Sequence, residues 1–444
     1  MRFDGSCISD SGDRITLAAS NIPDWDVNDG NTHTFARSQD DDRLSFSHTR
    51  VYDVSSGVNN FYAVGQRWVC DDGNAFASVY GILTVIFFPE GQDAILASHG
   101  FYFSGNVEGG PVTMDTVKIN PTVSGTAVVR FNGTSEIDEG DKVFLAASDT
   151  SNWGVYDGNA FIEVDDASIC LGYSPFSHSR VYHIDPGQHT FYAVAENFVE
   201  TDGSGDIYLY ASLTVEFYPD SSGIGVYFNG VSHDNIDLTN GPTNLSELSV
   251  HTNKNGNAMV IFDGTCVNDS GDQIILAASD MLSWGTENGS VSVEALNNDI
   301  NENSFSHTRV YPITTTTNYY AVGQNYNETD GNGIASIYGS FIAIFFPEVI
   351  DNIKQTSIEK PKLIFFPNPV TTSTMISFTL KQTEDVSVKI YDVTGRLIQT
   401  LSDVTMFSGN HQLVWNTENE DEGIYILRME TKNYYITEKL IVQK

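Results

Sequence analysis

Three copies of one sequence pattern, spaced about 130 residues apart, constrain the fold of this chain more than any other feature. Each copy contains a Phe-Asp/Asn-Gly segment, a Leu-Ala-Ala-Ser segment, a Phe-Ser-His-Thr/Ser-Arg-Val-Tyr segment and a closing Phe-Phe/Tyr-Pro. The copies begin at Phe3, Phe131 and Phe262. A period of this length indicates tandem whole domains rather than a solenoid of small units.

Each copy is predicted to form β structure. The segment Leu213-Thr-Val-Glu-Phe217 alternates apolar and polar residues, as expected for a strand with one buried face. Asp-Gly, Asn-Gly and Pro-Gly pairs separate the apolar runs and provide the positive φ that tight turns need. We therefore predict an all-β chain, with tandem β-sandwich or jelly-roll repeats followed by a small Ig-like β-sandwich.

The domain boundaries follow from what precedes each copy. A stretch of about 40 residues with an aromatic strand precedes the second and third copies but not the first. We therefore expect a β-sandwich repeat without its first strands at 1–90, complete repeats at 91–220 and 221–348, a linker at 349–363 and a C-terminal domain at 364–444. Because the first copy lacks this stretch, we expect the chain to begin inside a repeat. No secretory signal precedes the first copy, so a signal peptide would lie upstream of Met1.

Charge is distributed unevenly along the chain. The formal net charge is −36, from 22 Lys or Arg and 58 Asp or Glu. Residues 349–444 contain 10 basic and 12 acidic residues, which leaves 12 basic and 46 acidic residues in 1–348. Such an acidic surface repels phosphate backbones and anionic membranes, which argues against nucleic acid as a partner. No apolar run in the sequence is long enough to cross a membrane. The simplest role of this charge is to keep the protein soluble.

The four cysteines lack the CxxC spacing of zinc sites. Cys7 and Cys266 occupy equivalent positions, whereas Cys70 and Cys170 each occur in one copy only. A Cys7–Cys70 disulfide in an oxidising compartment is one open possibility.

The C-terminal segment departs from the repeat pattern. Its ordered motifs are Pro367-Asn-Pro369, Lys389-Ile-Tyr-Asp392 with Gly395-Arg396, Gly409-Asn-His411 with Trp415, Gly423-Ile-Tyr425 and Lys439-Leu440. Together they closely resemble the C-terminal sorting domain of proteins exported by the type IX secretion system of Bacteroidetes. The resemblance covers less than a fifth of the chain. It implies contact with the type IX secretion machinery and delivery to the outer-membrane surface or the extracellular space. The sorting-motif residues it marks are Pro367, Asn368, Pro369, Tyr391, Asp392, Gly395, Arg396, Trp415, Gly423, Tyr425 and Lys439.

One histidine motif recurs in all three copies. It places a histidine two residues before an arginine, so both side chains lie on one face of a strand. The pairs are His48 with Arg50, His178 with Arg180, and His307 with Arg309. A catalytic or anion-binding pair is one interpretation. We favour a structural role, in which carboxylate or backbone groups satisfy both side chains and fix strand register. No recognisable catalytic motif accompanies the pair.

Two kinds of loop are candidate ligand sites. Acidic turns containing Asp202, Asp206 and Asp330 offer oxygen ligands of the type that calcium prefers, although we favour the interpretation that they are ordinary Asp-Gly turns. Trp25, Trp153 and Trp284 stand in equivalent loops next to Asp, Asn and Gly. Such a tryptophan either stacks on a sugar or closes one end of the sandwich.

These features favour a non-enzymatic surface protein whose repeats serve in adhesion, in glycan binding or as a stalk. The alternative is a set of accessory binding repeats from a larger secreted enzyme, such as a polysaccharide hydrolase, with its catalytic domain upstream. A third interpretation, jelly rolls that associate in threes as complement-like domains do, rests on fold analogy only.

Overall fold

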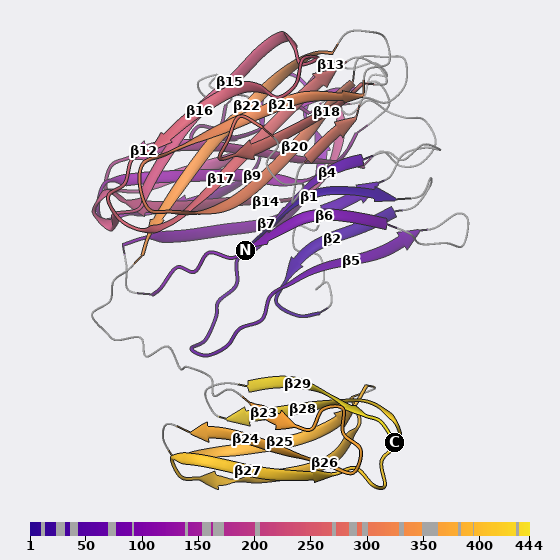
Figure 1. Ribbon diagram of the computed structural model, residues 1–444. Helices are drawn as coiled ribbons and strands as arrows, with labels where there is room; N and C mark the ends of the chain where they lie inside the picture. Colours follow the sequence, from indigo (N-terminus) through magenta and orange to yellow (C-terminus); the bar gives the residue numbers. More distant parts are fainter. Residues whose placement is uncertain are drawn as a thin grey trace. The chain divides into compact units, whose positions relative to one another are not determined.

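The computed structural model describes residues 1–9, 14–23, 32–35, 43–69, 77–90, 93–137, 141–152, 161–162, 173–199, 205–268, 272–283, 291–294, 301–327, 333–348, 363–380, 383–393, 395–431 and 435–444. They form two compact units, Met1–Glu348 and Val349–Lys444. The prediction of an all-β chain is confirmed, since a single 3-10 turn is the only helical element within these ranges (Figure 1). None of the described helical structure is long and apolar enough to cross a membrane.

The third repeat is an eight-stranded sandwich. One sheet has the order β15-β22-β17-β20 and the other β16-β21-β18-β19. Successive strands pass mostly from one sheet to the other, which is the wrapping of a jelly roll. The strands are β15 (Gly225–Asp237), β16 (Thr243–Val250), β17 (Gly256–Asn268), β18 (Gln273–Ser279), β19 (Val291–Glu294), β20 (Asn301–Ile313), β21 (Thr317–Asn327) and β22 (Ile334–Pro347).

The second repeat has the same topology. Its sheets have the orders β12-β9-β14-β7 and β11-β10-β13-β8. The strands are β7 (Ile95–Asn106), β8 (Val112–Ile119), β9 (Gly125–Ile137), β10 (Lys142–Ser148), β11 (Phe161–Ile162), β12 (Tyr173–Ile184), β13 (His189–Val199) and β14 (Asp206–Pro219).

The first repeat contains counterparts of only six of these strands. Its sheets have the orders β4-β1-β6 and β3-β2-β5. The strands are β1 (Arg2–Ser9), β2 (Arg14–Ser20), β3 (Thr32–Phe35), β4 (Arg43–Thr49), β5 (Tyr62–Val69) and β6 (Ala77–Thr84). Compared with the third repeat, the described residues include no equivalent of β15 or β16.

The Phe-x-Gly segment has the same packing role in every repeat. Its phenylalanine meets the phenylalanine of the Phe-Ser-His segment edge to face, with centroids 4.7 Å apart in the pairs Phe3–Phe46, Phe131–Phe176 and Phe262–Phe305. Its glycine lies against the next strand, where an added Cβ would come within 2.1–2.2 Å of a tyrosine carbonyl oxygen at Gly5, Gly133 and Gly264. Only glycine leaves room for this close approach of two backbones.

One inference from the alternating pattern is wrong. The polar positions within Leu213–Phe217 do not face solvent, because Thr214 is fully buried and Glu216 is 6% exposed. Strands β9 and β17 are likewise buried along nearly their whole length on both faces. The reason is that one sheet of each repeat packs against the other repeats, so its outer face is a second interior.

The C-terminal unit is a small sandwich with sheets β23-β24-β27 and β26-β25-β28-β29. Trp415 lies fully buried at its centre and packs edge to face on Tyr425, with centroids 5.1 Å apart. The strands are β23 (Ile364–Phe366), β24 (Ser373–Leu380), β25 (Glu384–Asp392), β26 (Leu397–Met406), β27 (Gly409–Asn416), β28 (Gly423–Thr431) and β29 (Tyr435–Val442).

The close approach at Gly264 gives a stability prediction. We expect Gly264→Ala to lower the free energy of unfolding by about 1–3 kcal/mol, because the new methyl group forces β17 away from β22. Urea denaturation checks this, with Asn257→Ala, an exposed position on the same strand, as the control. Equal stability of the two variants would contradict the packing argument.

Candidate functional site

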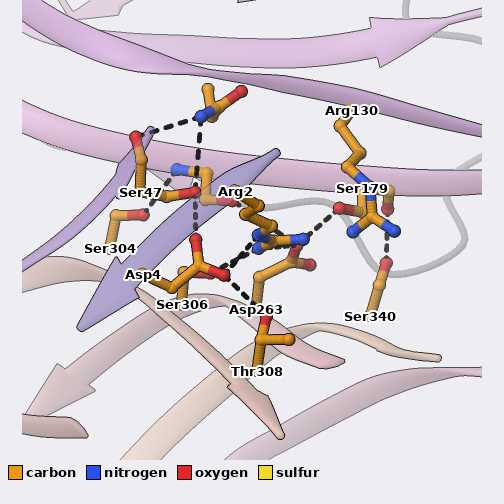
Figure 2. A network of polar contacts seen from close by, with 12 residues as sticks. Arg2, Asp4, Ser47, Arg130, Ser179, Asp263, Ser304, Ser306, Thr308 and Ser340 are labelled. Atoms are coloured by element: carbon orange, nitrogen blue, oxygen red, sulfur yellow. Dashed lines mark hydrogen bonds and ion pairs between the residues drawn. The ribbon is translucent and has the colours of Figure 1, made fainter. Parts of the chain in front are cut away.

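The three repeats meet mainly through one sheet each, namely β4-β1-β6, β12-β9-β14-β7 and β15-β22-β17-β20. Strands β3, β11 and β19, at the edges of the other sheets, also contact a neighbouring repeat. Hydroxyl and amide groups link all three pairs of repeats. Asn132 Nδ2 donates to the Ser47 carbonyl oxygen at 3.0 Å, and Ser340 Oγ donates to the Ser179 carbonyl oxygen at 2.6 Å. The first and third repeats are joined by a 2.6 Å hydrogen bond from Thr308 Oγ1 to Asp4. We call this buried set of polar contacts the polar junction (Figure 2).

Arg2 lies between two aspartates of different repeats within the polar junction. Its guanidinium pairs with Asp4 and lies 3.7 Å from Asp263, and all three side chains are at least 94% buried. Asp263 also accepts a 2.5 Å hydrogen bond from Ser179 Oγ, so it contacts both other repeats. Burial raises the pKa of Asp263, and the nearby Arg2 guanidinium only partly offsets this.

A second buried ion pair belongs to the second repeat alone. Arg130 Nη2 lies 3.3 Å from Glu216, and the Tyr218 hydroxyl donates to the same carboxylate at 2.9 Å. Burial by itself would raise the pKa of Glu216, but the Arg130 guanidinium more than offsets it, so the pKa lies below its ordinary value. Glu216 is therefore ionised at neutral pH and depends on Arg130 for charge compensation.

The charges of the polar junction do not follow the repeat symmetry. Arg2 and Arg130 occupy equivalent positions, and the third repeat has Ile261 there. At the position of Glu216, the first repeat has Ile86 and the third has Ile344. Asp4 and Asp263 correspond to Asn132. Our sequence reasoning missed these residues. The available signal was this exchange of charged and apolar residues at equivalent positions.

Next to the polar junction the contact becomes apolar. The closing Phe-Phe/Tyr-Pro segments contribute one ring each, with centroid distances of 5.7 Å for Phe88–Tyr218 and 5.9 Å for Tyr218–Phe346. Aliphatic side chains that include Val128, Ile261 and Ile344 complete this cluster. We call it the apolar junction. Equivalent residues from three repeats thus meet around one line, which makes Met1–Glu348 a single body with internal threefold pseudosymmetry.

The recurring histidine lies within each repeat, away from solvent. Its Nδ1 accepts a hydrogen bond from a backbone N–H of the opposite sheet, at 2.9, 2.9 and 2.8 Å for His48–Ala19, His178–Ala147 and His307–Ala278. These histidines are 0–2% exposed. In this position the ring joins the two sheets of the sandwich.

The arginine of the same motif reaches the following tyrosine. Arg50 donates to the Tyr52 hydroxyl at 3.2 Å, and the equivalent distance from Arg309 to Tyr311 is 3.5 Å. The Tyr311 hydroxyl then donates to the Ala278 carbonyl oxygen at 3.1 Å, the residue whose N–H is bound to His307. The motif therefore forms a clasp around one residue of the opposite sheet. Burial, with the nearby Arg309, lowers the pKa of His307 to about 3.

Only some of the other predicted site residues lie within the described ranges. Trp25, Trp153 and Trp284, together with Asp202, Asp330, Cys70 and Cys170, lie outside the described residues. Asp206 begins β14 and is exposed. Cys7 is a buried free thiol, with a pKa that burial raises to about 12. Asp141 and Asp272 stand at equivalent positions of the second and third repeats and accept hydrogen bonds from Asn197 and Asn325 at 2.7 and 2.8 Å.

The motif residues of the C-terminal unit stabilise turns and strand ends. Asn368 donates to the Lys439 carbonyl oxygen at 3.2 Å and accepts from the Ile441 N–H at 2.9 Å, which ties the Pro-Asn-Pro segment to β29. Arg396 lies 2.9 Å from Asp392 across the turn that contains Gly395, where φ is +84°. The conformation at Gly395 is one that glycine adopts without strain. The Tyr425 hydroxyl donates to the Asp421 carbonyl oxygen at 3.0 Å.

The C-terminal segment folds as a β-sandwich of its own, separate from the larger all-β unit that precedes it in the sequence. Residues 364–443 match the family described as secretion system C-terminal sorting domain. The suspected type IX sorting domain is thereby confirmed, and it marks the protein for export to the cell surface or the extracellular space.

Comparisons of the whole chain add little. No curated protein matched. A solved structure described as "Crystal Structure of the STIV MCP" is 8% identical, with a TM-score of 0.21, and the match covers 56% of this chain and 96% of that one. A second, "Structure of infectious bursal disease virus Gx strain", is 8% identical with a TM-score of 0.20, covering 78% of this chain and 66% of that one.

The buried ion pair gives a prediction with an internal comparison. Glu216→Gln leaves Arg130 as an uncompensated buried charge, so we expect a loss of about 3–5 kcal/mol in unfolding free energy. The triple variant R130I/E216I/Y218F copies the third repeat, which has Ile261, Ile344 and Phe346, and should recover most of that loss. Denaturation of both variants tests this; a triple variant no more stable than Glu216→Gln would contradict it.

The buried histidine predicts a pH dependence. In the unfolded chain His307 binds a proton below its ordinary pKa of about 6.5, whereas in the folded protein it does so only near pH 3. Its contribution is therefore present above pH 6.5 and declines as the pH falls, by up to about 1.4 kcal/mol per pH unit. His307→Asn retains an acceptor but cannot titrate.

We expect the stability difference between wild type and His307→Asn to shrink between about pH 6.5 and 4. Chemical denaturation at several pH values measures it. His251→Asn, at an exposed site, is the control for the substitution itself. A difference that stays constant across this range would argue that His307 is not held neutral.

Proposed function

We propose that this is a secreted or cell-surface binding protein, acting in adhesion or glycan recognition, whose three repeats form one rigid head. The observation that carries the proposal is the pair of junctions that unites the repeats. A flexible stalk needs no buried ion pairs between its domains, whereas a head that presents several weak sites gains from a fixed spacing between them. The sorting domain accounts for delivery of this head to the outside of the cell.

The burial of the histidine motif supports a non-enzymatic role. Nδ1 of His307 already accepts a backbone hydrogen bond, and the ring is 1% exposed. A general base must reach the proton that it removes and titrate near the working pH. His307 meets neither condition, since its pKa is lowered to about 3. The motif thus fits a structural clasp better than a catalytic pair.

Tryptophan and charge suggest the class of ligand. Each candidate tryptophan follows a strand of the sheet that takes no part in the junctions, namely β2, β10 or β18. An indole binds the apolar face of a sugar ring by stacking. Because residues 1–348 have 46 acidic and 12 basic side chains, we expect neutral glycans to be preferred over sulfated or uronic ones.

A glycan array probed with the full chain tests this proposal, with and without calcium. We expect binding of a neutral glycan that falls by about tenfold or more in Trp153→Ala/Trp284→Ala, because multivalent binding loses its avidity with its sites. Tyr435→Ala, an exposed aromatic residue of the C-terminal unit, is the control. Absence of binding under every condition would reject glycan recognition, and unchanged binding by the double variant would reject the tryptophans.

A further inference from the structure

We propose that a hollow at one end of the third repeat is a ligand site of its own, which takes a sugar bearing an anionic group. The hollow has a volume of about 460 Å³. It lies where the β16–β17 loop (251–255) meets the start of β15 and the turn between β20 and β21. The inference rests on the proposed role in glycan recognition, but it uses none of the candidate tryptophans.

The β16–β17 loop is held in place at both of its ends. The Tyr227 hydroxyl on β15 donates a hydrogen bond to the His251 carbonyl oxygen at 3.0 Å. The Glu348 N–H, just after β22, donates to the Asn255 carbonyl oxygen at 2.7 Å. Side chains between these two points therefore project from a fixed backbone, which lowers the entropic cost of ordering them around a ligand.

Aromatic rings and a cation line the hollow. The Tyr227 ring is half-buried and lies over Gly225, where an added Cβ would come within 2.8 Å of it. Phe345, which is 4% exposed, lines the hollow as well. Lys254 is exposed, and its Nζ lies 3.8 Å from the position that a Cβ on Gly223 would take. An aromatic ring can pack against the apolar face of a sugar, while an ammonium group binds an oxyanion.

The charge around the hollow is unusual for such an acidic repeat. Residues 221–348 contain 14 Asp or Glu but only two basic residues, Lys254 and Arg309. Arg309 is 8% exposed and belongs to the histidine clasp, so Lys254 is the one exposed lysine or arginine of this repeat.

Carboxylates are absent from the segments that build the hollow. None of the residues that line it is acidic, and residues 221–233, 248–262 and 303–327 contain no Asp or Glu. At physiological ionic strength, exposed charges farther away than about 8 Å are largely screened, so this local composition decides which ligand charge is tolerated. The preference for neutral glycans, which follows from the charge of residues 1–348 as a whole, does not extend to this hollow.

The cation and the aromatic wall are individual to the third repeat. Strand register places Val123 of the second repeat at the position of Lys254, and Ala97 at the position of Tyr227. A valine cannot bind an oxyanion, and an alanine cannot stack on a sugar. The common fold of the repeats therefore does not require a cation or an aromatic ring at this end.

Carboxylates instead occupy this end of the second repeat. Asp93 stands at the position of Gly223 and accepts a 3.3 Å hydrogen bond from Thr122. Asp185, just after β12, accepts a hydrogen bond of the same length from Ser124. An anion that approaches here meets two negative charges. The combination of a cation, an aromatic wall and missing carboxylates thus occurs in the third repeat but not in the second.

Binding of three trisaccharides to the full chain tests the inference. They are a galacturonic acid trisaccharide, a sulfated galactose trisaccharide and the neutral galactose trisaccharide. We expect one of the two charged ligands to bind about tenfold more tightly than the neutral one in calorimetry, with an affinity that falls as salt is added. The ligand that binds identifies the anionic group as a carboxylate or a sulfate. Hydrogen exchange should slow on binding in residues 251–256 and 313–317.

Variants of the protein locate the site. Lys254→Gln should weaken binding of the charged trisaccharide about tenfold while leaving the chain folded, because this side chain is exposed. Lys254→Arg keeps the charge and should retain most of the binding. Lys118→Gln removes an exposed lysine of the second repeat, and as the matched control it should bind as wild type does.

Three results would overturn the inference. They are failure of both charged trisaccharides to bind more tightly than the neutral one, equal affinity of Lys254→Gln and wild type, and full competition by an equal concentration of sodium sulfate. In the last case an anion alone would suffice, and the sugar would contribute nothing.

The double tryptophan variant separates this inference from the function proposed above. Binding of a charged trisaccharide that Lys254→Gln loses and Trp153→Ala/Trp284→Ala retains supports the hollow as an independent site. Binding of neutral glycans alone, with dependence on the tryptophans, would leave the proposed function standing and overturn the inference.

Discussion

The structure of Met1–Glu348 depends on taking charged groups out of water between three sheets. Arg2, Asp4 and Asp263 are almost completely buried there, as are Arg130 and Glu216. An isolated charge in such a place is strongly unfavourable. Each buried charge therefore requires a compensating group from its own sheet or from a neighbouring repeat. Arg2 needs Asp4 and Asp263, and Asp263 needs hydroxyl groups of the second repeat. The junction therefore holds only when all three repeats are in place.

The pseudosymmetry is broken where it matters for assembly. At the apolar junction the three repeats contribute similar rings, Phe88, Tyr218 and Phe346, and any order of repeats would bury them equally well. At the polar junction the order is fixed, because Arg2 of the first repeat lies beside Asp263 of the third, whereas the second repeat has Asn132 at the position of Asp263. Buried ionic groups often add little net stability. Here we infer that they specify which repeat lies beside which.

Sequence periodicity could predict strands but not what covers them. The all-β class, the repeats and the sorting domain follow from turn residues, spacing and ordered motifs. The alternation around Glu216 suggested one buried face, yet a neighbouring repeat buries the other, and a period of two is the same whether the second face meets water or protein. The polar junction was missed for that reason. The histidine clasp could be anticipated as a repeated motif, while its partner, a backbone N–H of the opposite sheet, has no sequence signal.

Comparison of equivalent positions recovers part of what periodicity misses. A position that is charged in one repeat and apolar in another, such as Glu216 and Ile344, lies where the repeats meet and has become individual to each. A position that stays apolar in every copy but differs in burial, such as Phe87 compared with Phe217 and Phe345, belongs to the packing surface of the repeat. Three copies in one chain thus allow the same position to be compared in three surroundings. The difference in burial between copies, rather than exposure in any one of them, distinguishes a packing position of the repeat from an ordinary exposed side chain.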